Sequence, residues 1–521
     1  MSCFSDYLRE NSSYRPDHAA VISEDRVLSY RQLDQDSNRL ANALIRLGLG
    51  KGNRAAVLMK SSVDWCVVWY ACQKLGVAVV PLHVRLPARE HVRTADLAGV
   101  SCLFYSNEYL KQAQYICENS SSLRWAVQHH PSEERAAEGV LTLDELIESG
   151  DSSPVDILLD GSETAVILFT SGTTGKSKGV LRTQNIVCSH AEVLAGSNTR
   201  GRIPETVLTP APLYHTAGLF CIFKTAALGG TLVLVDGFDP ERICAMIEKN
   251  SVTQLLLVPP VSYDRLYYSG FPQKYRLDSI NLALVTAGKC TDNGIMRIFE
   301  MFPNAALRPS WGATETCSCT GANLSREELL AHPERMRTVG KVNPAVEIRL
   351  VDEQGHDVPQ GVAGETLVRS SMVFSHYLGA PENREKYFDG DWFRTEDIMK
   401  QDEYGFYYLM DRKRDIVKTG GENVYAQEIE RVIQEHPSIH DCAVVGVPDE
   451  RFGEAIAAAV ALKPGERLNT DDFLEFCRER LPSFKKPRYL AVLDALPTNS
   501  VGKVQKTVLR RRAKDLFSKI C

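Results

Sequence analysis

The amino-acid sequence predicts a mixed α/β protein: a large N-terminal domain of layered α/β sheets plus a small β-barrel, followed by a small α+β domain. Three observations lead to this prediction. Short apolar runs alternate with helical segments as far as residue 286. Between Val346 and Arg369 the polarity alternates from residue to residue between turns, which is typical of antiparallel strands. After Arg412 a separate stretch of helices and strands follows, and a chain of 521 residues has room for two or more domains.

The first elements are a helix and two strands. Residues 30–47 carry leucines at helical spacing, Ser29 is suited to cap the start of this helix, and Gly48 ends it. Ala55–Met59 and Val77–Val80 are short apolar runs that we expect to form strands. Because strands and helices alternate, the sheets should be mostly parallel. The same alternation returns at Thr231–Val235, Gln254–Val258 and Leu282–Thr286.

The C-terminal part has a different pattern. Glu347–Val351 alternates in polarity, and Gly355 and Gly361 mark the turns that follow, so we expect antiparallel β structure there. The stretch after Arg412 has the size of a small domain, and we predict a division into residues 1–411 and 412–521. Within the second part we expect helices at 427–436 and 471–481 and strands at Cys442–Val447 and Ile456–Leu462.

Composition argues against several classes of protein. The net charge of −6 gives no indication of nucleic-acid binding. The most apolar stretch, Trp65–Leu82, contains Gln73 and Lys74, so we expect a buried helix that leads into a strand and no transmembrane segment. The 14 cysteines lack the spacing of zinc ligands, and we find neither a signal peptide nor a peroxisomal Ser-Lys-Leu ending. We therefore expect reduced thiols and a cytoplasmic protein.

The most informative stretch is a glycine-rich loop at residues 170–180, which follows the apolar run Ala165–Phe169. It reads Thr-Ser-Gly-Thr-Thr-Gly-Lys-Ser-Lys-Gly-Val. Glycines let backbone N–H groups approach an anion, hydroxyl groups donate to phosphate oxygens, and lysines supply positive charge. A buried strand followed by such a loop is suited to bind a polyphosphate.

The loop alone leaves alternatives open. A P-loop needs a glycine where Thr170 stands and a helix directly after the lysine. Here Gly179 and the β-branched Val180 favour a hairpin turn instead. A plain flexible turn rich in serine, glycine and threonine is a third interpretation.

Six further segments complete a pattern that runs in order from residue 170 to residue 506. They are Pro212–Gly218, Thr286–Cys290, Ser310–Thr316, Trp392–Asp397, Asp411–Val424 and Leu496–Lys506. Together with the loop, they resemble the motifs of the adenylate-forming superfamily, which comprises acyl-CoA synthetases, adenylation domains and luciferases. An ordered set of this kind is far more specific than any single motif.

The resemblance implies an ATP site. Its nucleotide contacts would be Thr170, Ser171, Gly172, Thr173, Thr174, Gly175 and Lys178 in the loop, Gly288, Trp311, Gly312, Ala313 and Thr314 around the adenine and the α-phosphate, and Asp397 and Arg412 at the ribose. Glu315 would hold Mg²⁺, a hard cation that takes oxygen ligands. His215 would lie at the wall between the nucleotide and acyl pockets.

The resemblance also implies a second set of residues near the C-terminus. Lys503 would be the lysine of the adenylation step, and Lys418, Gly420 and Gly421 would face the thiol in thioester formation. Arg414 would be the pivot about which a mobile C-terminal domain rotates between the two steps. The chain departs from the family pattern at several of its motifs: at Ser177, Lys289, Trp311, Glu396 and Arg414.

The expected activity is that of an ATP-dependent, AMP-forming acyl-CoA ligase with ATP, Mg²⁺ and coenzyme A. It would activate a carboxylic acid as the acyl-adenylate and pass the acyl group to the CoA thiol. The alternatives are a ligase that loads an acyl-carrier protein, a P-loop NTPase and a non-catalytic homologue. Because Thr216 stands where amino-acid-activating domains carry an aspartate, an amino acid substrate is less expected. Aryl, medium-chain and short polar acids of the carnitine type all stay open, and so does a homodimer.

Overall fold

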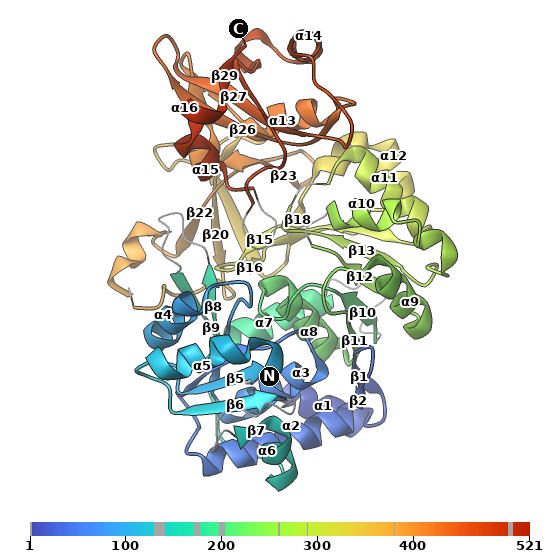
Figure 1. Ribbon diagram of the computed structural model, residues 1–521, viewed down its shortest axis with the longest axis vertical. Coiled ribbons are helices and arrows are strands. Elements are labelled where there is room, and N and C mark those ends of the chain that lie inside the picture. The colour runs from blue at the N-terminus through green and yellow to red at the C-terminus, as the bar shows by residue number, and fades with distance from the viewer. Residues whose placement is uncertain are drawn as a thin grey trace. The chain divides into compact units, whose positions relative to one another are not determined.

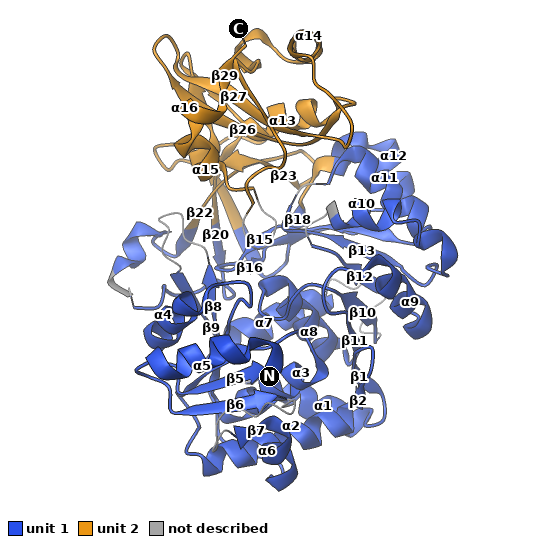
Figure 2. Ribbon diagram, in the orientation of Figure 1, with its two compact units in different colours: residues 1–336, 340–347, 368–393 blue, residues 337–339, 348–367, 394–521 orange. Residues whose placement is uncertain are grey.

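The computed structural model describes residues 3–129, 141–170, 178–196, 204–258, 261–288, 290–379, 381–498 and 504–520. The chain forms two compact units, which Figure 2 shows in different colours. Unit 1 contains residues 1–336, 340–347 and 368–393, and unit 2 contains residues 337–339, 348–367 and 394–521. The predicted division into a domain of residues 1–411 and a mobile domain of residues 412–521 stays a prediction.

Unit 1 is built around two seven-stranded sheets (Figure 1). The first has the order β7-β6-β5-β3-β4-β8-β9 and the second the order β14-β13-β12-β10-β11-β1-β2. The recorded pairings are parallel except those of β8 with β9 and of β1 with β2, as the alternation of strands and helices predicts. The strands are β1 Ala19–Ile22, β2 Val27–Ser29, β3 Arg54–Leu58, β4 Ala78–Pro81, β5 Cys102–Ser106, β6 Trp125–His129, β7 Leu141–Thr142, β8 Thr164–Thr170, β9 Lys178–Thr183, β10 Thr206–Thr209, β11 Thr231–Leu234, β12 Gln254–Leu256, β13 Leu282–Val285 and β14 Ala306–Pro309.

The helices of unit 1 cover these sheets, and several begin and end at residues that the sequence marks. Ser29 and Gln32 form a capping box at the start of α2, so the predicted cap is confirmed. Gly76 ends α3 in the left-handed conformation, with φ at +67°. The helices are α1 Ser5–Tyr14, α2 Tyr30–Arg46, α3 Val63–Leu75, α4 Ala88–Ala98, α5 Leu110–Asn119, α6 Leu143–Ser149, α7 Gln184–Gly196, α8 Thr216–Leu228, α9 Pro240–Asn250, α10 Val261–Tyr268, α11 Asp292–Met301 and α12 Arg326–Ala331.

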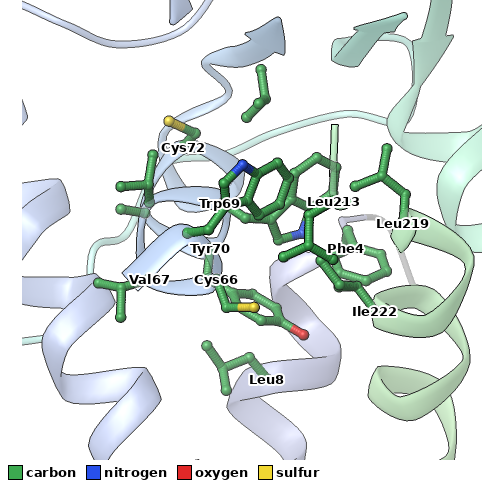
Figure 3. Packing of buried hydrophobic residues seen from close by; sticks show 14 of the residues in the cluster. Phe4, Leu8, Cys66, Val67, Trp69, Tyr70, Cys72, Leu213, Leu219 and Ile222 are labelled. Carbon is green, nitrogen blue, oxygen red and sulfur yellow. The ribbon is translucent and has the colours of Figure 1, made fainter. Parts of the chain in front are cut away.

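The main core of unit 1 lies where α1, α3 and α8 meet. Figure 3 shows Phe4 close to the side chains of Trp69 and Tyr70 on one side and Ile222 of α8 on the other. The apolar stretch at 65–82 is the buried helix α3 followed by β4, as predicted. Among the described residues, no helix combines the length and the apolar character that crossing a membrane would require.

The predicted antiparallel β region is present. It comprises β15 Gly312–Ala313, β16 Cys317–Ser318, β17 Thr320–Gly321, β18 Gly340–Val342, β19 Val346–Val351, β20 Gly364–Ser370, β21 Phe388–Asp389, β22 Trp392–Gln401 and β23 Phe406–Arg412. The partition between the two units cuts β19, β20 and β22, because each of these strands has residues in both.

The rest of unit 2 is an α+β structure around a sheet of order β25-β24-β27-β28-β29, in which β26 also pairs with β27. The helices and strands expected after Arg412 are confirmed, and β26 and β27 are longer than predicted because they pair along their whole length. The elements are β24 Val417–Thr419, β25 Glu422–Val424, α13 Ala426–Gln434, β26 Ile439–Asp449, β27 Gly453–Leu462, α14 Thr470–Arg480, β28 Tyr489–Leu493, α15 Lys506–Arg511, α16 Ala513–Leu516 and β29 Ser518–Lys519.

Candidate active site

Strands β8 and β9 form the hairpin that carries the glycine-rich loop. Thr170 at the end of β8 is the register partner of Lys178 at the start of β9. Because a strand follows the loop directly, the P-loop alternative is wrong: that motif opens a helix. Ser171, Gly172, Thr173, Thr174 and Gly175 lie outside the described residues.

Lys178 lies against two tyrosines of unit 1. Its Nζ donates to the hydroxyl of Tyr387 at 3.1 Å and lies 4.6 Å from the centre of that ring and 4.8 Å from the centre of the Tyr377 ring. Aromatic faces attract cations, so both rings orient the ammonium at the base of the loop. Tyr377 also forms a bridge to Val180 of β9, which fixes this arrangement to the hairpin.

Thr314 and Glu315 lie in the turn between β15 and β16. The side chain of Arg182, a residue of β9 that is only 1% exposed, donates to the Thr314 carbonyl oxygen from Nε at 3.0 Å and from Nη2 at 2.7 Å. The hydroxyl of Thr216 lies 3.4 Å from that of Thr314. The hairpin, the turn and the start of α8 are therefore brought together, as the motifs require.

Glu315 is held from the other side. Its Oε1 accepts a hydrogen bond from the Tyr377 hydroxyl at 2.8 Å, and its carbonyl oxygen accepts one from the Phe374 N–H at 2.9 Å. The described residues contain no cluster of three or more metal-ligating side chains. Proteins commonly bind Mg²⁺ through one or two carboxylates together with substrate phosphates. Glu315 thus fits the role of a magnesium ligand.

The predicted adenine segments also lie side by side. Thr286 at the end of β13 donates through its hydroxyl to the Ser310 carbonyl oxygen at 3.2 Å, which brings the exposed Gly288 and Trp311 into neighbouring segments. Trp311 itself is 6% exposed, and its backbone N–H donates a hydrogen bond to the Thr320 hydroxyl. A side chain at Gly312 would overlap the Cys317 carbonyl oxygen, at 1.8 Å from the Cβ position, so the narrow β15–β16 hairpin needs glycine there.

His215 stands immediately before α8, as its N-cap residue. Burial, reinforced by the positive charge that His83 would carry, lowers the pKa of His215 to about 4. The imidazole is therefore neutral near pH 7.

In unit 2, Asp397 of β22 and Arg412 of β23 are register partners. Oδ1 of Asp397 lies 3.1 Å from Nε of Arg412, and Asp397 is 4% exposed. Its N–H donates to the Thr395 hydroxyl at 3.1 Å. Glu396 between them has φ at +62°, a conformation that favours glycine. Glutamate at this position of β22 is therefore strained, because it adopts a conformation that glycine adopts freely.

The predicted pivot lies in a short 3₁₀ helix, Lys413–Asp415. Burial and then the charge of Arg412 lower the pKa of Arg414. The neighbouring Asp415 pairs with Arg510 of α15 at 2.7 Å. Lys503 lies outside the described residues.

The segment predicted to face the thiol is a tight hairpin. Strands β24 and β25 pair through Thr419 and Glu422, which leaves Gly420 and Gly421 as the two-residue loop. Their φ angles of +59° and +87° are those that a type I′ turn requires, and glycine adopts them without strain. Lys418, on β24, is largely exposed.

Sequence reasoning did not find Arg182, Tyr377 and Tyr387. Arg182 directly follows the apolar pair Val180–Leu181 in β9, and this was the one signal that it has a buried polar partner. The two tyrosines gave no signal, because aromatic residues in a loop are usually structural.

Comparisons with known proteins identify the family of the chain. The family of AMP-binding enzymes matches residues 8–378, and the AMP-binding enzyme C-terminal domain matches residues 428–503. The long-chain-fatty-acid–CoA ligase FadD13 of Mycobacterium tuberculosis is 30% identical over 510 residues, which are 97% of each chain. The medium-chain fatty-acid–CoA ligase of Escherichia coli is 30% identical over 97% of this chain and 90% of its own.

Among solved structures, the anthranilate CoA ligase AuaEII in complex with anthranoyl-AMP is 25% identical, with a TM-score of 0.89 over 98% of this chain and 97% of its own. The fold is thus the α/β fold of these enzymes. From the two family matches and the ligase relatives it follows that the chain is a ligase of the AMP-binding enzyme family, within the adenylate-forming superfamily.

Proposed function

We propose that the protein is an ATP-dependent, AMP-forming acyl-CoA ligase. The observation that supports this most directly is the network in unit 1 that links Lys178, Tyr377 and Glu315. It joins a cation at the base of the loop to a carboxylate suited to Mg²⁺. The Asp397–Arg412 pair of unit 2 is a further polar group that fits a ribose.

In the first step, a carboxylate would attack the α-phosphorus of ATP with release of pyrophosphate. Both reactants are anionic, so the reaction depends on neutralised charge and in-line positioning more than on acid–base groups. Lys178, the loop and Lys503 would supply positive charge and donors, and Thr314 would orient the α-phosphate or the carboxylate. Mg²⁺, when bound at Glu315, would neutralise phosphate charge.

In the second step, the CoA thiol would attack the acyl carbonyl, and AMP would leave. We propose that the part of the chain after Arg412 rotates about Arg414 between the steps. Lys503 would serve the first step, and Lys418 and the Gly420–Gly421 turn would serve the second. Hinges of this kind need only a few residues that change φ and ψ.

The activity is tested by incubating the protein with ATP, Mg²⁺, CoA and a panel of carboxylic acids, and by resolving AMP, ADP and free thiol. We expect AMP that depends on the acid, with a matching loss of thiol. AMP without loss of thiol would indicate a carrier protein as the acceptor. ADP, or no product from any acid, would contradict the proposal.

Lys503→Ala separates the two steps. We expect adenylate formation to fall by about a hundredfold or more, because an electrostatic contact of the transition state is lost. Thioester formation from synthetic acyl-AMP and CoA should be largely kept. The matched control is Lys506→Ala, a lysine that pairs with Glu430. Equal loss of both steps in a folded Lys503→Ala variant would contradict the role assigned to Lys503.

A further inference from the structure

Lys224 of α8 is a buried lysine without a hydrogen-bond partner among the described residues. Its side chain is 0% exposed, and the carboxylate that pairs with its Nζ, Oε2 of Glu205, is 3.8 Å away. Lys74 shows what a buried lysine ordinarily has: its Nζ donates to the carbonyl oxygen and Oδ1 of Asp34 at 2.9 and 2.7 Å and to Oδ1 of Asn38 at 2.6 Å. Because a buried ammonium needs acceptors, Lys224 is suited to receive one from a ligand.

The surroundings of Lys224 favour an anion. Burial, which Glu205 partly offsets and Arg308 reinforces, lowers the pKa of Lys224 to about 8. Arg308 is also buried, and its guanidinium donates to the neutral amide oxygen of Asn323 at 2.7 Å. Lys224 and Arg308 are therefore two cations beside Glu205, the one carboxylate among the described groups that act on Lys224, and an additional negative charge would balance them.

Lys224 shares a helix with the candidate active site. Ala217, Cys221 and Lys224 follow one another at helical spacing, on the face of α8 opposite to Leu219 and Ile222, which Figure 3 shows in the core. Burial increases along this face, from the half-buried Ala217 to the fully buried Cys221 and Lys224. Of the two residues directly above the lysine on the helix, Cys221 is small and the half-buried Phe220 is aromatic.

The distance along α8 sets the length of the ligand. Thr216, which contacts Thr314, lies eight residues before Lys224, and at about 1.5 Å per residue their Cα atoms are about 12 Å apart. Helical side chains tilt toward the N-terminal end of their helix, which here is the Thr216 end. A ligand that touches both ends would have its two polar groups separated by several bonds.

We propose that Lys224 binds a second carboxylate of the substrate, so that the acid activated at Thr314 is a medium-chain dicarboxylic acid. This inference rests on the proposed ligase function and names its substrate class. The second carboxylate supplies the acceptor that Lys224 lacks and balances the charge of Lys224 and Arg308.

The test compares acids of equal length that differ at the far end. AMP formation is measured with adipate, suberate and sebacate and with hexanoate, octanoate and decanoate. We expect kcat/KM for the preferred dicarboxylic acid to exceed that of its monocarboxylic partner by about tenfold or more, as for a charged hydrogen bond. In Lys224→Met this preference should be lost or reversed.

Failure of the inference and failure of the proposed function are distinguishable. Monocarboxylic acids used at least as well as dicarboxylic acids by the unchanged protein, with the same ratio in Lys224→Met, would overturn the inference and leave the ligase function intact. No AMP from any acid would instead contradict the proposed function. The control Lys74→Met removes a buried lysine that already has its acceptors, and it should lower the unfolding midpoint without changing the ratio.

The double variant Lys224→Met/Glu205→Gln is used if the single variant folds poorly. It removes both charges of the pair, so that no Glu205 carboxylate stays buried without Lys224. We expect it to have lost the preference for dicarboxylic acids. A folded double variant that keeps the preference would show that Lys224 serves only its ion pair with Glu205.

Discussion

At the scale of single residues, the Thr314–Glu315 turn of unit 1 is held by two side chains from outside it. Arg182 binds the Thr314 carbonyl oxygen, and Tyr377 binds the Glu315 carboxylate. Burying the guanidinium costs hydration free energy, which its two hydrogen bonds to the Thr314 carbonyl oxygen partly offset. The same two bonds fix the turn that carries Thr314. These contacts pre-organise the turn before a ligand arrives.

A residue-scale prediction concerns the strained Glu396. We expect Glu396→Gly to raise the free energy of unfolding by about 1 kcal/mol, because a non-glycine residue in the left-handed region costs roughly 1–2 kcal/mol and glycine loses more entropy on folding. The measurement is the midpoint of urea unfolding, followed by a probe of unit 2. Glu396→Ala is the matched control, since it keeps the strain and removes only the carboxylate. A lower midpoint for the glycine variant would contradict the prediction.

The sequence alone was sufficient to propose most of the site residues, because each stands in a motif with fixed spacing, and their roles stay predictions. It was not sufficient for Arg182, because the carbonyl oxygen that this arginine binds belongs to Thr314, a residue 132 positions away. A partner that is distant in the chain leaves no local pattern. The same holds for Tyr377 and Glu315, which are 62 positions apart.

At the scale of elements, the start of α3 combines a cap with a buried ion cluster. Ser62 caps the helix, and Asp64 in its first turn accepts hydrogen bonds from His129, at 2.9 Å, and from Arg26. Burial alone would raise the pKa of Asp64, but the hydrogen bond from His129 and the charge of Arg26 lower it overall. The carboxylate also lies at the positive end of the helix dipole.

This cluster predicts a loss of stability in acid. Because the folded-state pKa of Asp64 is lowered, its contribution is present above the unfolded value of about 3.9 and is lost as the pH falls through the folded value. We expect Asp64→Asn to lower the urea midpoint at pH 7, and the gap to the unchanged protein to close below about pH 4. Unfolding curves from pH 3 to pH 7 measure it. A gap that is constant over this range would contradict the assignment.

The elements themselves were largely predictable. The strand expected at Thr231–Val235 is β11, Thr231–Leu234, and the helix expected at 471–481 is α14, Thr470–Arg480. The pattern of apolar residues fixes such elements, since each buries one face. The ends of β26 and β27 were not predictable, because they are set by pairing between the strands.

At the scale of the whole molecule, the proposed rotation gives a prediction for Arg414. Arg414→Pro fixes φ near −65°, which the present 3₁₀ conformation tolerates and other conformations do not. We therefore expect one of the two steps to survive and the other to fall by about tenfold or more, as for a missing conformational step. Adenylate formation and thioester formation from synthetic acyl-AMP are measured separately. Arg414→Ala, which removes the side chain without fixing the backbone, should keep both steps, and two intact steps in the proline variant would contradict the pivot.

The molecule-scale organisation was predicted in outline only. The sequence pattern predicts a large α/β part followed by a small α+β part, because buried parallel strands are continuous apolar runs and antiparallel strands alternate in polarity. The partition of β19, β20 and β22 between two compact units cannot be predicted from the sequence, since it depends on which contacts form across the sheet and not on local composition.

That partition has a consequence for biosynthesis. Unit 2 begins with residues 337–339 and 348–367, yet unit 1 still needs residues 368–393 to be complete. As the chain leaves the ribosome, synthesis of unit 2 starts before unit 1 is finished. Residues 348–367 can pack into unit 2 only after the stretch from residue 394 onward has been made. The two units therefore cannot be made as separate continuous fragments. A chain that ends at residue 411 instead keeps the sheet β17-β18-β23-β22-β20-β19 almost whole, because Arg412, the last residue of β23, is the one residue of that sheet that it lacks.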